Sequence, residues 1–137
     1  MSHDNPISDV GQKPKLVGTA ILLLYIYSVI SFLITLILSI INNGQLSGGL
    51  FCVQLLIFLI GVFLIFQTSK GKTWSRNIIR SFFVLGLFVG LWFLFGVKNE
   101  FRYLFITLAI QNAVGLIIIS PLYRKPAQEW FETFKNR

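Results

Sequence analysis

Four long apolar runs, separated by short polar segments, make up most of this chain of 137 residues. They are Leu16–Ile41, Leu50–Gln67, Ile78–Val97 and Tyr103–Leu122, and Arg80 is the one formal charge inside them. A helix on the surface of a soluble protein shows a polar face with a period of 3.6 residues, which these runs lack. Each run has the roughly 17–25 residues that a helix needs to cross about 30 Å of hydrocarbon. The pattern therefore predicts an all-α membrane protein with four transmembrane helices.

The polar segments divide the chain into three parts. Residues 1–15 mix Pro, Gly, Ser, Asn and Asp and predict a flexible leader. Residues 16–123 form the predicted transmembrane domain, and residues 124–137 form a tail. The first apolar run is longer than the roughly 7–15-residue core of a cleaved signal peptide, and no small-x-small site follows it. We therefore expect this run to be a retained helix.

The net charge of +7 comes from 12 Lys and Arg against 5 Asp and Glu. Four spans put both termini on the same side as the segment between the second and third runs. That side then carries ten Lys and Arg, whereas the other side carries two, Lys98 and Arg102. Because loops rich in Lys and Arg stay in the cytoplasm, the distribution predicts cytoplasmic termini. The charge thus indicates orientation, and we expect no nucleic-acid partner.

The segment before the third run is the richest in basic residues. Lys72, Arg76 and Arg80 recur at intervals of four, and Trp74 is placed for the interfacial belt. The arginine stems can extend toward lipid phosphates, so one interpretation is a site for a lipid headgroup or an acidic partner. The other is a loop that only anchors the orientation, and we favour the second.

The tail predicts a short helix over Pro126–Arg137, with Pro at its first position. On such a helix Ala127, Trp130, Phe131 and Phe134 share one face. A helix of about 12 residues is marginally stable alone in water, so its aromatic face needs a surface to cover it. The membrane interface is the preferred surface, and a partner protein is the alternative.

Small residues recur on two of the apolar runs. Gly86 and Gly90 form a GxxxG pair, which lets another backbone approach closely. Ser31, Thr35 and Ser39 are spaced in the same way on the first run. Both sets predict helix-packing seams, either within one chain or between copies, and the intramolecular use is favoured in a four-helix protein.

Two side-chain amides, Gln111 and Asn112, lie near the middle of the fourth run. They must face protein or water, because leaving a polar group unsatisfied in lipid costs roughly several kcal/mol of free energy. Ser28 and Gln54 are candidate partners on other helices. We favour hydrogen bonding between helices over a substrate or ion site.

The chain offers little reactive chemistry. None of the four runs has an ionisable residue at mid-depth, which cation-coupled transporters usually carry. The sequence shows no Ser/His or Cys/His pair, no converging carboxylates, no metal-spaced His and no phosphate-binding glycine loop. The single cysteine, Cys52, excludes an internal disulfide. We expect neither an enzyme nor a bound cofactor or metal.

A two-part motif is formed by the basic segment and the tail. Gly71-Lys-Thr-Trp-Ser-Arg76 opens the third run, and Pro126 followed by Glu129-Trp-Phe131 closes the chain. Over residues 70–134 this resembles a loose group of small, largely uncharacterised bacterial inner-membrane proteins with a G-K-x-W-A-R segment and a Pro…Trp-Phe tail. Ser75 stands where that group usually has Ala. The resemblance implies a four-helix fold in a bacterial inner membrane, and it implies no activity.

These observations favour a non-catalytic multi-pass membrane protein that acts through contacts with proteins or lipids, as an accessory subunit, envelope factor or toxin-immunity protein does. The expected partners are membrane lipids, another membrane protein or a second copy of the chain. The alternative is a small transporter or channel that oligomerises, with a polar site at Gln111 and Asn112.

Overall fold

The computed structural model describes residues 13–43, 48–96 and 102–135. Most of the predicted leader, residues 1–12, and Lys98 lie outside the described residues. The described part is helical throughout its length, apart from short connections. Its elements are α1 (Lys15–Asn43), α2 (Gly48–Ser69), α3 (Thr73–Gly96), α4 (Arg102–Ile119), the 3-10 turn η2 (Ser120–Tyr123) and α5 (Lys125–Lys135).

Four of these helices are long and apolar enough to cross a membrane. In the most apolar window of each, only 11–17% of the residues are buried inside the chain. Large apolar side chains therefore face outward, among them Ile117, which is 70% exposed, and Phe95, which is 86% exposed. Soluble monomers do not expose continuous apolar surface on this scale, and a bilayer would cover it. The predicted all-α fold, with four membrane-length helices and a short C-terminal helix, is confirmed.

The fourth span ends differently from its prediction. The apolar run continues to Leu122, but α4 stops at Ile119 and the chain tightens into η2. Pro121 lies in the first turn of η2, and a proline has no N–H to continue an α-helical ladder. At Arg124 the backbone becomes extended before α5 begins. The proline thus redirects the chain across the end of the bundle.

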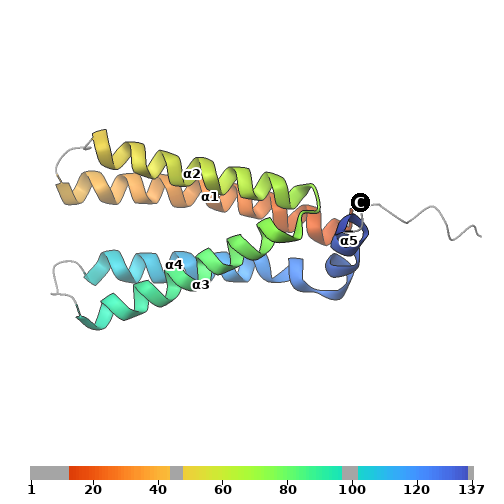
Figure 1. Ribbon diagram of the computed structural model, residues 1–137. Helices are drawn as coiled ribbons and strands as arrows, with labels where there is room; N and C mark the ends of the chain where they lie inside the picture. The colour runs from red at the N-terminus through yellow and green to blue at the C-terminus, as the bar shows by residue number, and fades with distance from the viewer. Residues whose placement is uncertain (1–12, 44–47, 97–101, 136–137) are drawn as a thin grey trace, which may run out of the picture.

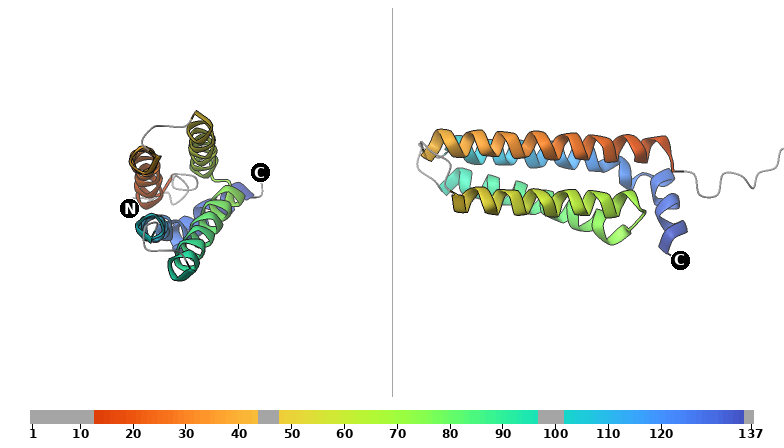
Figure 2. Two further views of the ribbon diagram at one scale, coloured as in Figure 1. Left: turned by 90° about the vertical axis from the view of Figure 1, so that its left-hand side faces the viewer. Right: turned by 90° about the horizontal axis from the view of Figure 1, so that it is seen from above.

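The long helices form two antiparallel hairpins, α1–α2 and α3–α4 (Figure 1). The most extensive contact joins α3 to α4, followed by α1 to α2, while α2–α3 and α1–α4 contacts connect the hairpins. Seen from its end, the bundle has the helices in the cyclic order α1, α2, α3, α4 (Figure 2). The two hairpins diverge with distance from α5 (Figure 1).

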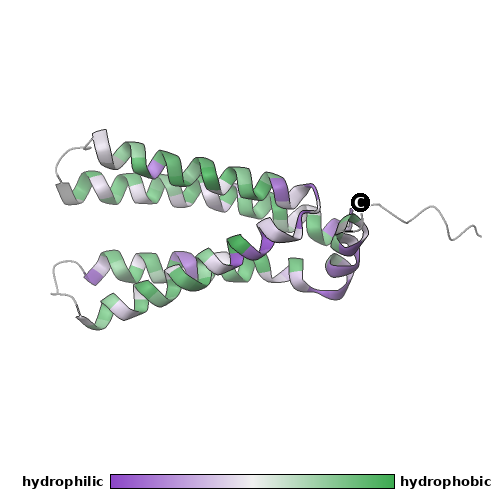
Figure 3. Cartoon of the chain, viewed as in Figure 1, coloured by the Kyte–Doolittle hydropathy of each residue, from purple (hydrophilic) through white to green (hydrophobic). Residues whose placement is uncertain are grey.

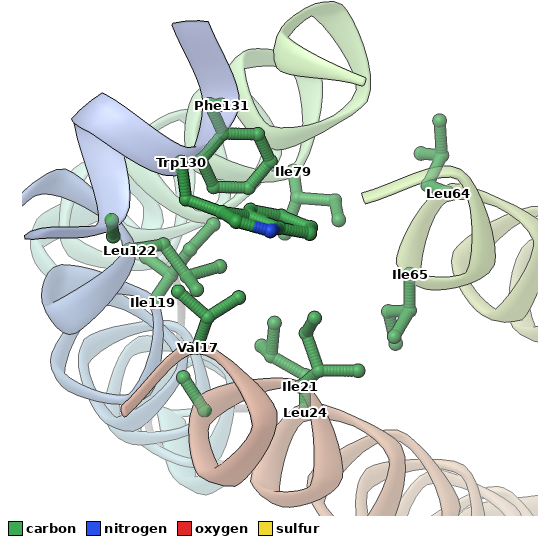
Figure 4. Close-up of a cluster of buried hydrophobic side chains, with 12 residues drawn as sticks. Val17, Ile21, Leu24, Leu64, Ile65, Ile79, Ile119, Leu122, Trp130 and Phe131 are labelled. Carbon is green, nitrogen blue, oxygen red and sulfur yellow. The ribbon is translucent and has the colours of Figure 1, made fainter. Parts of the chain in front are cut away.

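The hydrophilic residues gather at the end of the bundle where α5 lies, whereas the four long helices are largely hydrophobic (Figure 3). The hydrophobic core is at this same end, between the helix termini and α5 (Figure 4). Its side chains converge from all four long helices, η2 and α5. They are Val17, Ala20, Ile21, Leu24, Leu64, Ile65, Ile79, Ile119, Leu122, Ala127, Trp130 and Phe131.

Candidate intramembrane binding site

Glycines set the close packing between α3 and α4. A Cβ added at Gly86 would clash with the amide of Asn112, and one added at Gly90 would lie 3.1 Å from the backbone nitrogen of Ala109. A third glycine, Gly115 on α4, faces the Phe83 ring. A Cβ added at Gly115 would lie 2.6 Å from Cε1 of Phe83. The GxxxG pair therefore lies in an intramolecular seam. Gly115 was missed from the sequence, although its spacing of three from Asn112 on an apolar helix was a usable signal.

The two neighbouring amides of α4 point to different places. Asn112 is 9% exposed, lies against Gly86, and donates from Nδ2 to the Leu108 carbonyl at 2.7 Å. Gln111 faces α1 instead, where the Tyr27 hydroxyl donates to its backbone carbonyl at 2.7 Å. Asn112 thus belongs to the α3–α4 seam, and the Gln111 side chain lines the space between the hairpins.

That space contains two adjoining cavities. The central cavity, of about 470 Å³, is bounded by all four long helices. The distal cavity, of about 340 Å³, lies farther from α5 between α1, α2 and α4. Thr35, Gln54, Leu108 and Gln111 line both cavities. Most of the central wall is aliphatic or aromatic, and its polar positions are Tyr27, Ser28, Ser31, Thr35, Gln54, Gln111 and Asn112.

The hydroxyl residues Ser31, Thr35 and Ser39 of α1 line these cavities. Ser31 and Thr35 line the central cavity, and Thr35 and Ser39 line the distal one. Thr35 Oγ1 donates to the Ser31 carbonyl at 2.8 Å, so the helix itself satisfies this hydroxyl. The close α1–α2 contact lies beside them, where the rings of Phe32 and Phe58 are 4.8 Å apart. The residues predicted to form a helix-packing seam on α1 therefore line the walls of the two cavities.

Two polar atoms in this wall lack a hydrogen-bond partner within the part of the chain that the structure describes. Gln54 Oε1 and Gln111 Nε2 are buried, and neither has a hydrogen-bond partner among the described residues. Gln54 was a candidate partner for the α4 amides, and it shares the cavity with Gln111 without bonding to it. A hydrogen-bond acceptor and a donor are thus available to a bound group inside the membrane. Pairing with them would be favourable, because leaving either atom unpaired costs free energy.

α5 covers the end of the bundle, where residues of the hydrophobic core separate it from the central cavity. Ala127, Trp130 and Phe131 are 0%, 6% and 0% exposed, and they pack on the hydrophobic core (Figure 4). The periodicity identified this face, but the expected covering surface was the membrane interface or a partner. The chain's own bundle covers it instead, because η2 turns α5 back over the helix ends.

Arg76 holds α5 in place. It is 9% exposed, and its Nη1 donates to the Leu122 carbonyl at 2.8 Å. The guanidinium lies 4.4 Å from the ring centroids of both Tyr123 and Phe131, within the range of cation–π attraction. Arg76 and Trp130, both named as candidates for contact with a lipid headgroup or partner, are therefore buried inside the chain.

The turn between α2 and α3 completes the contact with α5. Gly71 has a φ of +80°, and its Cα faces the ring of Phe134. Beside it, the fully buried hydroxyls of Thr68 and Ser75 are 2.9 Å apart and join the end of α2 to the start of α3. Ser75 stands at the motif position where the proteins that the sequence resembles usually have Ala. Its hydroxyl makes a hydrogen bond that the sequence did not reveal.

The remaining residues of the basic segment stay on the surface. Lys72 and Arg80 are exposed, and Trp74 is 46% exposed. The Arg80 guanidinium lies 4.8 Å from the Tyr123 ring centroid, so it shares this ring with Arg76. Lys13 lies 5.8 Å from the Trp130 ring, and partial desolvation lowers the pKa of this lysine from its ordinary value. These cations surround the α5 end of the bundle.

Comparisons with protein-family models, curated proteins and solved structures each return no match to this chain. The interpretation of function therefore depends on the geometry of the cavity and its closure.

Proposed function

We propose that this chain is a non-catalytic membrane protein that acts by contact, and that the contact is the uptake of an amphipathic molecule from the bilayer into the central cavity. The observation that carries the proposal is a cavity of about 470 Å³ between two helical hairpins, with an apolar wall and two unpaired amide atoms. Ligand pockets in proteins range over about 300–1,000 Å³ and combine such walls with a few polar groups.

The size of the central cavity suits a small molecule or one lipid chain. Its volume of about 470 Å³ lies within the roughly 300–1,000 Å³ of ligand pockets in proteins.

The rim of the cavity supports access from the bilayer. Ile57 and Ile60 of α2 and Phe82 of α3 line the cavity, and they are 65%, 46% and 61% exposed. An apolar rim that faces outward between two membrane-length helices gives a lipid-soluble molecule a path that avoids water. The closure of the bundle end by α5 favours this lateral path.

A cavity-filling variant tests the proposal. Gly61 lines the cavity, and a Cβ there would lie 3.8 Å from Ser28 Oγ, an ordinary contact, so the ring of Gly61→Phe is placed to occupy the cavity. Gly18→Phe is the matched control, because the space around Gly18 is open and Gly18 does not line the cavity. We expect native mass spectrometry to detect bound lipid-like molecules on the wild type and on Gly18→Phe, and to detect few on Gly61→Phe. Equal occupancy in all three proteins would contradict the proposal.

We propose further that the chain belongs to a bacterial inner membrane, with its termini and the α2–α3 turn in the cytoplasm. Support comes from the cations that surround the α5 end, among them Lys72, Arg80 and Lys125. With Cys52 replaced by Ala, a membrane-impermeant thiol reagent should label Arg102→Cys in intact cells and Ser69→Cys only after permeabilisation. The reverse pattern would invert the topology.

The second candidate is a small oligomeric transporter with its polar site at Gln111. One observation favours it. The two cavities adjoin and share four lining residues, so the polar wall continues away from α5. The shared residues are Thr35, Gln54, Leu108 and Gln111. Asn112 is held in the α3–α4 seam and contributes less than the sequence suggested. Flux of glycerol or urea into liposomes by a purified oligomer would favour this candidate, and a monomer without flux would remove it.

A further inference from the structure

The unpaired amide atoms belong to different walls of the cavity. Gln54 lies on α2 and Gln111 on α4, and these helices are diagonal neighbours in the bundle rather than adjacent ones (Figure 2). Both residues line the central and the distal cavity, so both side chains border the region where the cavities adjoin. One wall offers an acceptor, Gln54 Oε1, and the other offers a donor, Gln111 Nε2.

We propose that the cavity selects amphipathic molecules whose polar group is uncharged and both donates and accepts a hydrogen bond, such as a primary amide or a hydroxyl. This inference rests on the proposed function, since it specifies the ligand of the same cavity. A group placed between the two walls donates to Gln54 Oε1 and accepts from Gln111 Nε2. Such a group satisfies two buried atoms that have no other partner among the described residues.

The electrostatics of the wall exclude a charged group. Among the residues that line either cavity, none carries a formal charge. A carboxylate or an ammonium group would therefore lose its hydration without gaining a counter-ion, which is strongly unfavourable in a low-dielectric interior. A carboxylate would also present no donor to Gln54 Oε1, and an ammonium group would present no acceptor to Gln111 Nε2.

The rest of the wall suits the apolar part of such a molecule. Toward α5 the cavity is lined by Phe83, Leu24 and Ile79, and Phe32 and Phe58 add aromatic surface to the same wall. An alkyl chain or an aromatic ring there gains apolar contact over most of its surface. The ligand is thus expected to place its polar group toward the distal cavity and its apolar part toward α5.

Four probes with the same alkyl chain test the selection. Tetradecanamide, tetradecanol, tetradecanoate and tetradecylammonium compete with tritiated tetradecanamide for the full-length protein in lipid nanodiscs, with empty nanodiscs as background. We expect the amide and the alcohol to bind at least tenfold more tightly than the two charged probes. Gln54→Leu and Gln111→Leu should each weaken amide binding by about 2- to 12-fold, the effect of one hydrogen bond. Gln67→Leu on α2, outside both cavities, is the matched control and should bind as the wild type does.

Two results would overturn the inference and leave the proposed function standing. One is equal binding of all four probes that Gly61→Phe blocks, which would show a cavity that recognises the chain alone. The other is unchanged amide binding in Gln54→Leu and Gln111→Leu when both variants are folded by thermal unfolding in the same nanodiscs. If no probe binds and Gly61→Phe behaves as the wild type in mass spectrometry, the inference and the proposed function both fall.

Discussion

Replacing Gly71 by Ala tests how the α2–α3 turn holds α5. Gly71 has a φ of +80°, a region that side chains other than glycine rarely occupy. A Cβ on Gly71 would also lie 2.7 Å from Cδ2 of Phe134, closer than atoms of two side chains can approach. The variant therefore combines backbone strain at residue 71 with displacement of an aromatic ring of α5.

The two contributions can be separated in magnitude. A non-glycine residue in this backbone region costs about 1–3 kcal/mol. Overpacking against a ring costs about 1–3 kcal/mol more, because Phe134 would have to leave its contact with Trp130, whose ring centroid is 5.1 Å away. We expect Gly71→Ala to lower the free energy of unfolding by about 2–6 kcal/mol in all. In a Phe134→Ala background the packing contribution disappears, and about 1–3 kcal/mol should remain.

The assay is unfolding in mixed micelles of a mild detergent and dodecyl sulfate, followed by circular dichroism, with trypsin cleavage after Arg124 as a measure of α5 docking. Gly18→Ala is the control, and it should stabilise α1 by about 0.5–1 kcal/mol because it adds a side chain to a helix in open space. The same loss in both Phe134 backgrounds would refute the packing argument. No loss in either would refute the strain argument as well.

Three further comparisons test the packing elsewhere. Gly90→Leu should lower stability by about 1–3 kcal/mol because its Cβ meets the α4 backbone, and Gly90→Ala should have a smaller effect in the same thermal unfolding assay. Asn112→Leu should destabilise by a similar amount, about 1–3 kcal/mol, since it overfills the space against α3, whereas Gln111→Leu should be neutral or stabilising because it removes an unpaired buried N–H. Arg76→Lys should weaken α5 docking by about 1–2 kcal/mol as measured by tryptic cleavage, whereas Arg80→Lys, at an exposed position, should not. Equal effects within any of these pairs would contradict the corresponding contact.

The fold was predictable because its main signal is local. Four uninterrupted apolar runs allow only membrane-length helices, and the observed bounds differ from the predicted ones by a few residues. The end of α4 is the clearest difference, since hydropathy continues through Pro121 while the helix does not. There a covalent property of proline outweighs the apolar character of the sequence.

The candidate site was predictable only in part, because it depends on which helix faces which. The sequence indicated that Gln111 and Asn112 face protein, but their neighbours follow from the order of helices around the bundle. Likewise the spacing of Trp130, Phe131 and Phe134 defined an apolar face without defining what covers it. The Thr68–Ser75 hydrogen bond joins two ordinary polar residues across a turn, and no periodicity marks such a pair.

The closure of the bundle by α5 bears on both candidate functions. The turn motif and the tail motif, separated by about fifty residues in the sequence, meet in the structure through the Arg76–Phe131 and Gly71–Phe134 contacts. A protein that only binds a molecule from the bilayer has no need to break these contacts, because the residues that line the cavity all belong to the four long helices. A transporter must open the cavity to each side in turn, and on this side it would have to expose the buried Arg76, Trp130 and Phe131 to water. Burial of a hydrogen-bonded arginine between two aromatic rings opposes that movement, so the packing that holds α5 favours binding over transport.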